Sequence, residues 1–140
     1  MRSFSFAVVG LALVALTGCA TTSQHKFTAP SDQWRNRIGQ MRYQDDKTSF
    51  IGDVLARTSS NGNFELTFSK GPGVTLMLVQ QDPDFVRVSG PLARGSWSGS
   101  PKNAPKHLRG WLSLRDEIAN VPNGKTVRKT IGGQTFVFRF

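Results

Sequence analysis

The residues of this chain best suited to chemistry are one thiol and two imidazoles. Cys19 is the single cysteine among the 140 residues, and the two histidines are His25 and His107. A thiol can be a nucleophile, a metal ligand or a site of acylation, and the first two roles usually need a partner such as histidine. Neither histidine has a second ligand at metal-site spacing. We therefore predict two ordinary surface histidines and no metal site.

Other patterns that can indicate catalysis lack an essential residue or position. The segment 95–99 places Trp97 at the centre of a pattern in which a nucleophile elbow needs serine. The paired carboxylates are predicted in turns or on a helix surface, where solvated acids are more common than an acid/base pair. These pairs are Asp45 with Asp46, Asp82 with Asp84, and Asp116 with Glu117. The sequence predicts no catalytic residue, no cofactor and no enzyme.

The surroundings of Cys19 resemble the lipobox of bacterial lipoproteins. Met1 and Arg2 precede an uncharged stretch, residues 4–16, and Leu16-Thr17-Gly18 leads directly to Cys19. The stretch is shorter than the roughly 20 residues that a membrane-spanning helix needs, so it is predicted to be a processing signal. The resemblance implies that residues 1–18 are removed and that Cys19 is acylated. An ordinary secretory signal with a chance cysteine is the alternative.

Acylation of Cys19 would place the protein in the cell envelope. Acyl chains on one residue give lasting attachment, because each buried methylene contributes about 0.8 kcal/mol. In lipoproteins of this kind an aspartate after the cysteine retains the protein at the inner membrane, and Ala20 occupies that position here. The resemblance therefore implies an outer-membrane anchor, with the domain facing the periplasm.

The chain is strongly basic. Its formal charge is +9 and falls to +8 when Arg2 is removed with the signal. An exported protein does not meet nucleic acid, so the charge favours anionic lipid headgroups, lipopolysaccharide phosphates or an acidic envelope polymer as partners. A generally basic, soluble surface is the alternative.

The first residues after Cys19 are predicted to link the anchor to one domain. Residues 19–30 are small, polar and end in proline, as in a tether, and residues 31–140 have the length of a single β-rich domain. In the segment 31–43, Trp34, Ile38 and Met41 have helical spacing, which favours a helix. The end of this segment could equally be a strand.

From residue 49 the chain reads mainly as consecutive strands. Alternating or apolar runs separated by turn residues occupy 49–58, 63–70, 74–81, 85–90 and about 93–98. A helix is predicted from about 105 to 119, after a proline-rich basic loop. The fold class is therefore mainly β (α+β), an antiparallel meander of about seven strands with one or two packed helices.

Two hairpins allow a prediction of register. A three-residue loop at 71–73 would place Phe68 opposite Leu76 and Leu66 opposite Leu78, which joins two apolar faces. Gly132-Gly133 is a two-residue loop that pairs Val127 with Phe138 and Lys129 with Phe136. Arg128, Val137 and Arg139 then lie on the solvent-exposed face of the last hairpin.

The layout of the elements resembles that of the lipoprotein-sorting (Lol) outer-membrane receptor and its periplasmic carrier. The shared features are a lipobox, a Trp-bearing segment, the runs SFIGDVLAR and NFELTFSKGPGVTLMLV, a Pro-rich helix insertion and a terminal hairpin. The resemblance covers residues 34–140. It implies a half-barrel sheet whose helices plug an apolar cavity that accepts acyl chains.

Two main hypotheses follow. In the first, the apolar face of the sheet binds acyl chains of a lipid or lipoprotein, driven by burial of apolar surface. In the second, the core is solid and an envelope adaptor binds a protein or acidic polymer. A hydrolase in which Ser98, His107 and an aspartate converge ranks third. The predicted wall of the acyl site is Phe64, Leu66, Phe68, Leu76, Leu78, Trp97, Trp111, Phe136 and Phe138.

Overall fold

The computed structural model describes residues 25–140, so Cys19 and the predicted signal lie outside the described part. Eight strands and one α-helix make up the fold, with two short 3-10 turns, η1 (Pro91–Ala93) and η2 (Pro101–Asn103). The helix is α1 (Lys106–Asn120). The strands are β1 (Arg35–Gln44), β2 (Ser49–Thr58), β3 (Phe64–Ser69), β4 (Thr75–Gln81), β5 (Val86–Gly90), β6 (Gly95–Gly99), β7 (Thr126–Ile131) and β8 (Gln134–Arg139).

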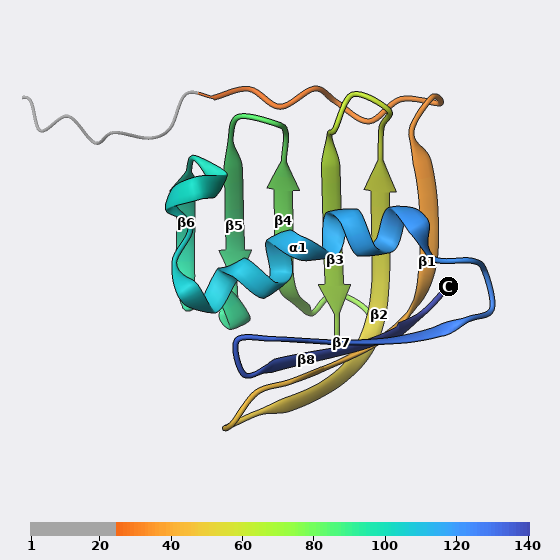
Figure 1. Cartoon of the computed structure of the whole chain (residues 1–140), viewed down its shortest axis with the longest axis vertical. Coiled ribbons are helices and arrows are strands. Elements are labelled where there is room, and N and C mark those ends of the chain that lie inside the picture. Colours follow the sequence, from red (N-terminus) through yellow and green to blue (C-terminus); the bar gives the residue numbers. More distant parts are fainter. Residues whose placement is uncertain (1–24) are drawn as a thin grey trace, which may run out of the picture.

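The strands form one antiparallel sheet in the order β6-β5-β4-β3-β2-β1-β8-β7. The first six strands are a meander, in which each strand pairs with the next along the chain. The chain then crosses the sheet as α1, and the β7–β8 hairpin joins the free edge of β1 (Figure 1). In this view β7 and β8 run across the direction of β3–β6, so the sheet is strongly twisted. The prediction of a mainly β, antiparallel fold is confirmed, with eight strands and one α-helix.

The prediction of a helix in residues 31–43 is wrong, because most of that segment belongs to strand β1. The side chain of Met41 is buried with 1% exposed, whereas that of Ile38 is 76% exposed, so the two point to opposite faces of the sheet. β1 pairs with β2 over its whole length and also with β8. Gly39 permits the second pairing, since a Cβ there would lie 2.0 Å from the carbonyl oxygen of Arg139.

The predicted register of the β3–β4 hairpin is also wrong, although its turn is as expected. The N–H of Lys70 donates to the carbonyl of Val74 (2.9 Å), which closes the loop 71–73. A β-bulge then inserts Leu76, so that Phe68 pairs with Met77 and not with Leu76. One extra residue reverses the faces of the rest of the strand. Leu66 accordingly pairs with Val79, and Leu78 points away from the core.

The last two predicted elements are confirmed. The β7–β8 hairpin pairs Val127 with Phe138 and Lys129 with Phe136. The helix α1 differs by one residue at each end from the predicted range. Its buried positions are Leu108, Gly110, Trp111, Leu112, Leu114 and Ile118. Within residues 25–140 no helix has the length and hydropathy needed to cross a bilayer.

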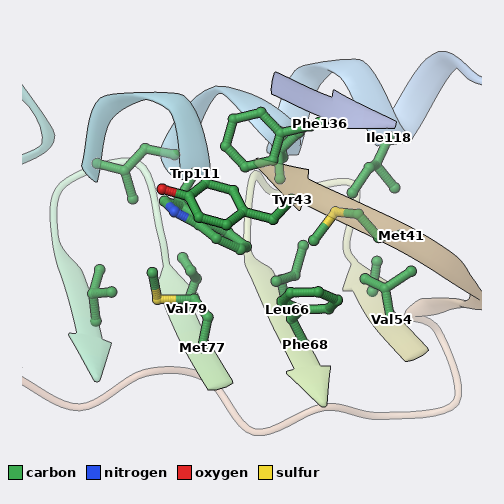
Figure 2. Close-up of a cluster of buried hydrophobic side chains, with 14 of the residues drawn as sticks. Met41, Tyr43, Val54, Leu66, Phe68, Met77, Val79, Trp111, Ile118 and Phe136 are labelled. Atoms are coloured by element: carbon green, nitrogen blue, oxygen red, sulfur yellow. The ribbon is translucent and has the colours of Figure 1, made fainter. Parts of the chain in front are cut away.

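The core lies between α1 and one face of the sheet, which we call the inner face. Trp111 is fully buried near the middle of α1 and contacts three aromatic rings from β1, β3 and β8 (Figure 2). The ring centroids of Tyr43, Phe136 and Phe68 lie 4.9, 5.0 and 5.9 Å from that of Trp111. Each aromatic pair of this kind contributes about 0.5–1.5 kcal/mol beyond its buried area.

Candidate functional site

The residues predicted to line an acyl site belong to this core. Seven of the nine are buried, with at most 6% of each side chain exposed: Phe64, Leu66, Phe68, Leu76, Trp111, Phe136 and Phe138. The other two are half-buried. Leu78 lies on the outer face, the side of the sheet opposite α1, and Trp97 packs at the margin of the core on the edge strand β6. The structure therefore brings most of the predicted wall together, as side chains in contact with one another.

Side chains occupy the space between α1 and the inner face. Figure 2 shows Trp111, Tyr43 and Phe136 between α1 and the side chains of the sheet, among them Val79, Leu66 and Phe68. Rings from both sides are in contact. An acyl chain could enter this space only if α1 moved away from the sheet. That movement would expose the fully buried Trp111 side chain, at a cost of several kcal/mol.

A surface hollow of about 480 Å³ lies where four segments meet. Asp45 and Asp46 of the β1–β2 turn face Arg94, the start of α1 at Lys106 and His107, and the β7–β8 turn. Gln134 is the most buried residue that lines the hollow, with 8% of its surface exposed. The Gln134 Nε2 donates to the Tyr43 hydroxyl (3.0 Å) and to the carbonyl of His107 (2.8 Å). Charges of both signs line the hollow, so it has no evident preference for an anion or a cation.

The Tyr43 hydroxyl connects Gln134 to Asp45 within this lining. It donates to Asp45 Oδ2 (2.9 Å), while Asp45 Oδ1 accepts the N–H groups of Lys47 and Thr48 and the Thr48 hydroxyl. Burial alone would raise the pKa of the Asp45 carboxyl, but these hydrogen bonds together lower it from 3.8 to about 2. Burial, and then the bond to Asp45, raises the pKa of Tyr43 to about 12. Asp45 is therefore a turn-capping carboxylate.

The residues of the hydrolase hypothesis do not converge. Ser98 pairs with Arg87 and lies on the outer face of edge strand β6, whereas His107 begins α1 on the other side of the sheet. The His107 Nε2 lies 3.3 Å from the carbonyl oxygen of Ala93. Within residues 25–140 no group of three histidine, cysteine or acidic side chains could hold a metal ion.

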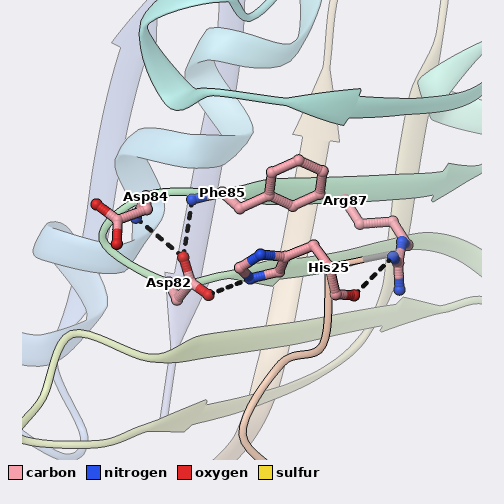
Figure 3. A network of polar contacts seen from close by, with 5 residues as sticks. All are labelled: His25, Asp82, Asp84, Phe85 and Arg87. Carbon is pink, nitrogen blue, oxygen red and sulfur yellow. Dashed lines mark hydrogen bonds and ion pairs between the residues drawn. The ribbon is translucent and has the colours of Figure 1, made fainter. Parts of the chain in front are cut away.

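Residues 25–30, the described part of the predicted tether, form a strap that contacts the domain through His25 and Phe27. The ring of His25 stacks on Phe85 with centroids 4.4 Å apart, and its Nε2 bonds to the Asp82 carboxylate (Figure 3). The carbonyl of His25 accepts a hydrogen bond from Arg87 Nη2 (3.2 Å), and the Arg87 guanidinium lies 5.2 Å from the centroid of the Phe27 ring. This strap contacts the β4–β5 loop and the outer face of β5.

The Asp82 carboxylate also organises the loop that receives the strap. Its Oδ1 accepts the N–H groups of Asp84 (2.9 Å) and Phe85 (2.7 Å). Burial alone would raise the pKa of Asp82, but the bonds from Asp84, His25 and Phe85 lower it below 3.8. A charged Asp82 thus holds both its own loop and His25.

Three arginines of the outer face lie close together on the neighbouring strands β1, β8 and β7. The register aligns Arg42 of β1, Val137 of β8 and Arg128 of β7 in one row across the sheet. Arg139 lies two residues along β8 from Val137, on the same face. None of these arginines makes an ion pair or a side-chain hydrogen bond within residues 25–140, although Lys129 pairs with Glu117 from the inner face (2.7 Å).

Two of the most exposed large apolar side chains lie on this outer face. Ile51 pairs with Arg42, and its side chain is 67% exposed. Ile38 lies on β1, the strand next to β8, and is 76% exposed. The sequence predicted that Arg128 and Arg139 lie on the solvent-exposed face of the last hairpin. It did not predict that Arg42, Ile38 and Ile51 lie beside them. The missing information was the pairing of β8 with β1, which joins residues almost a hundred positions apart.

Comparison with protein-family models and with curated proteins finds no match for this chain.

Proposed function

We propose that this chain is a lipid-anchored, non-enzymatic protein of the cell envelope, whose β-rich domain acts as an adaptor with a solid core. The lipobox-like sequence at Cys19 supports the anchor and an outer-membrane, periplasm-facing location. The side chains between α1 and the sheet leave little room for a ligand, so the adaptor would bind an envelope protein or an acidic polymer through its surface.

The observation that carries this proposal is the position of Trp111. Its side chain fills the middle of the space between α1 and the sheet and contacts Tyr43, Phe68 and Phe136. An acyl-chain carrier needs an apolar cavity of several hundred Å³ at this place. A filled core therefore favours the adaptor over acyl-chain binding, even though the half-barrel shape implied by the Lol resemblance is compatible with the twisted sheet.

Mass spectrometry of the membrane-extracted full chain tests both parts of the proposal. We expect a mature species that begins at Cys19 and carries acyl chains, and no non-covalently bound lipid under native conditions. The Cys19→Ser variant should lack the acyl mass. An acyl lipid that stays bound to the domain in the native spectrum would overturn the solid-core adaptor and favour a carrier. Absence of acyl mass on the wild-type chain would overturn the anchor.

A further inference from the structure

Arg42, Arg128 and Arg139 form a cluster on the outer face and make no ion pair within the described residues. The nearest carboxylate in the register is that of Asp53 on β2, which lies opposite Gln40, the residue that also pairs with Arg139. Arg42 and Arg128 flank Val137 from the two neighbouring strands, and Arg139 follows on β8. Adjacent strands lie about 4.8 Å apart, so the three side chains share a small area of the sheet. Like charges at this spacing repel one another unless an external anion lies between them. The cluster is therefore suited to several anionic groups in one plane.

The apolar side chains beside this cluster indicate whether the bound anion belongs to a soluble polymer or to a lipid surface. Ile51 lies directly next to Arg42, and Ile38 is on the same face of β1, both mostly exposed. A soluble polyanion gives exposed isoleucines no apolar environment. A phospholipid surface does, because arginine and apolar side chains together bind its phosphate and acyl boundary. The combination favours a membrane surface over a polymer.

The described strap reaches the domain from the same face of the sheet as the arginine cluster, at β5, which lies five strands from β8. The strap contacts Arg87, whose side chain is on the outer face of β5 (Figure 3). Five residues lie between Cys19 and His25, and the six residue steps span at most about 20 Å when fully extended. The anchor must therefore insert close to the point at which the strap joins the outer side of the domain.

We propose that the outer face is the membrane-facing surface of the anchored domain. Arg42, Arg128 and Arg139 contact the phosphates of anionic lipid headgroups, and Ile38 and Ile51 enter the interfacial region. This inference rests on the proposed lipid anchor. It leaves α1 and the surface hollow near His107 directed toward the aqueous phase, where a partner can reach them.

A fluorescent label on one introduced cysteine tests the orientation. Because Cys19 is acylated in the mature chain, Ile51→Cys provides the only free thiol on the outer face, and Ala119→Cys provides the matched position on exposed α1. The lipidated chains are placed in vesicles of phosphatidylcholine with and without phosphatidylglycerol, together with a lipid-borne quencher. We expect quenching at position 51 but not at position 119, and stronger quenching in the anionic vesicles.

Charge variants test the arginines. The triple substitution R42Q/R128Q/R139Q should lower the ratio of docked to undocked domain roughly a hundredfold, since each charge near an anionic surface contributes about a factor of five. The control K102Q/K106Q/R109Q removes three exposed charges around the start of α1, on the opposite side of the sheet, and should keep the quenching. High salt should weaken it in the wild type.

Three outcomes would overturn the inference. Equal quenching at positions 51 and 119 would exclude this orientation, and so would an unchanged signal in the triple arginine variant. Protection of the position-51 label from a water-soluble quencher by soluble polyphosphate, without quenching by lipid, would assign the face to a polyanion. The intact mass of each sample reports acylation separately, so loss of the anchor is distinguished from failure of the orientation.

Discussion

At the scale of single residues, the structure assigns many charged side chains to structural tasks. The Asp45 carboxylate closes the β1–β2 turn by accepting hydrogen bonds from Lys47, Thr48 and Tyr43. Asp82 acts similarly in the β4–β5 loop. The sequence predicted turn acids at both places, but only the folded structure shows that each carboxylate also bonds to a side chain from outside its own loop.

The Asp45 turn predicts a pH-dependent loss of stability. Because folding lowers the pKa of this carboxyl from 3.8 to about 2, its contribution is fully present above pH 3.8 and is lost as the pH falls through about 2. Asp45→Asn should lower the free energy of unfolding at pH 7 by about 1 kcal/mol, a modest value because water screens a partly exposed group. Urea unfolding between pH 2 and 7 measures this difference.

The neighbouring Asp46 provides the control for this experiment. Its side chain is exposed and makes no hydrogen bond within the described residues. Asp46→Asn should leave the free energy of unfolding nearly unchanged at every pH. A difference between Asp45→Asn and wild type that persists undiminished at pH 2 would contradict the role given to the carboxylate charge.

At the scale of elements, Arg37 of β1 stabilises the end of α1. Its Nη1 donates to the carbonyl of Ile118 (2.6 Å) and its Nη2 to Asn123 Oδ1 (2.8 Å), while the guanidinium lies 4.6 Å from the centroid of the Phe140 ring. Burial, and then the charge of Arg35, lowers the pKa of Arg37. The last carbonyls of a helix lack partners within the helix and carry partial negative charge, which a cation satisfies.

Replacement of Arg37 should therefore release the end of α1. Arg37→Met keeps much of the apolar stem but removes the donors, and we expect a loss of about 1.5–3 kcal/mol in unfolding free energy. Arg35→Met, at an exposed position on the same strand, should change it by less than about 0.5 kcal/mol. Amide exchange should become faster near Ile118 in the first variant alone. Equal stability of the two variants would contradict this assignment.

At the scale of the whole molecule, Trp111 joins three parts of the fold that are distant in sequence. It contacts β3 of the meander through Phe68, β1 through Tyr43, and the C-terminal hairpin through Phe136. The side chain is fully buried, and its Nε1 has no hydrogen-bond partner within residues 25–140. Loss of the ring should affect global stability, whereas loss of the donor alone should not.

Two substitutions separate these contributions. Trp111→Ala should lower the free energy of unfolding by about 3–5 kcal/mol, because the surrounding rings cannot close the cavity. Trp111→Phe should cost clearly less, since it keeps an aromatic ring and removes an unpaired buried donor. Trp97→Ala at the margin of the core is the control and should cost less than Trp111→Ala. A Trp111→Ala cost below about 1 kcal/mol would show that the interior has spare room.

The sequence by itself determined the elements whose signals are local. The β7–β8 hairpin and α1 follow from a two-residue glycine loop, strict alternation and apolar residues at helical spacing, all within short windows. The localisation prediction at Cys19 also rests on local sequence, outside the described residues. The mainly β, antiparallel architecture could also be predicted, because most of the chain is a succession of short alternating or apolar runs separated by turn residues.

Only the tertiary structure decided features that depend on distant partners. Residues 35–44 are a strand because β2 and β8 pair with both edges of β1, which outweighs the helical spacing of Trp34, Ile38 and Met41. The bulge at Leu76 reversed the faces of β4 without altering the turn before it. The same pairing of β8 with β1 placed Arg42 next to Val137, and so created the arginine cluster. Contacts between residues far apart in the chain decide these features, and no local pattern encodes them.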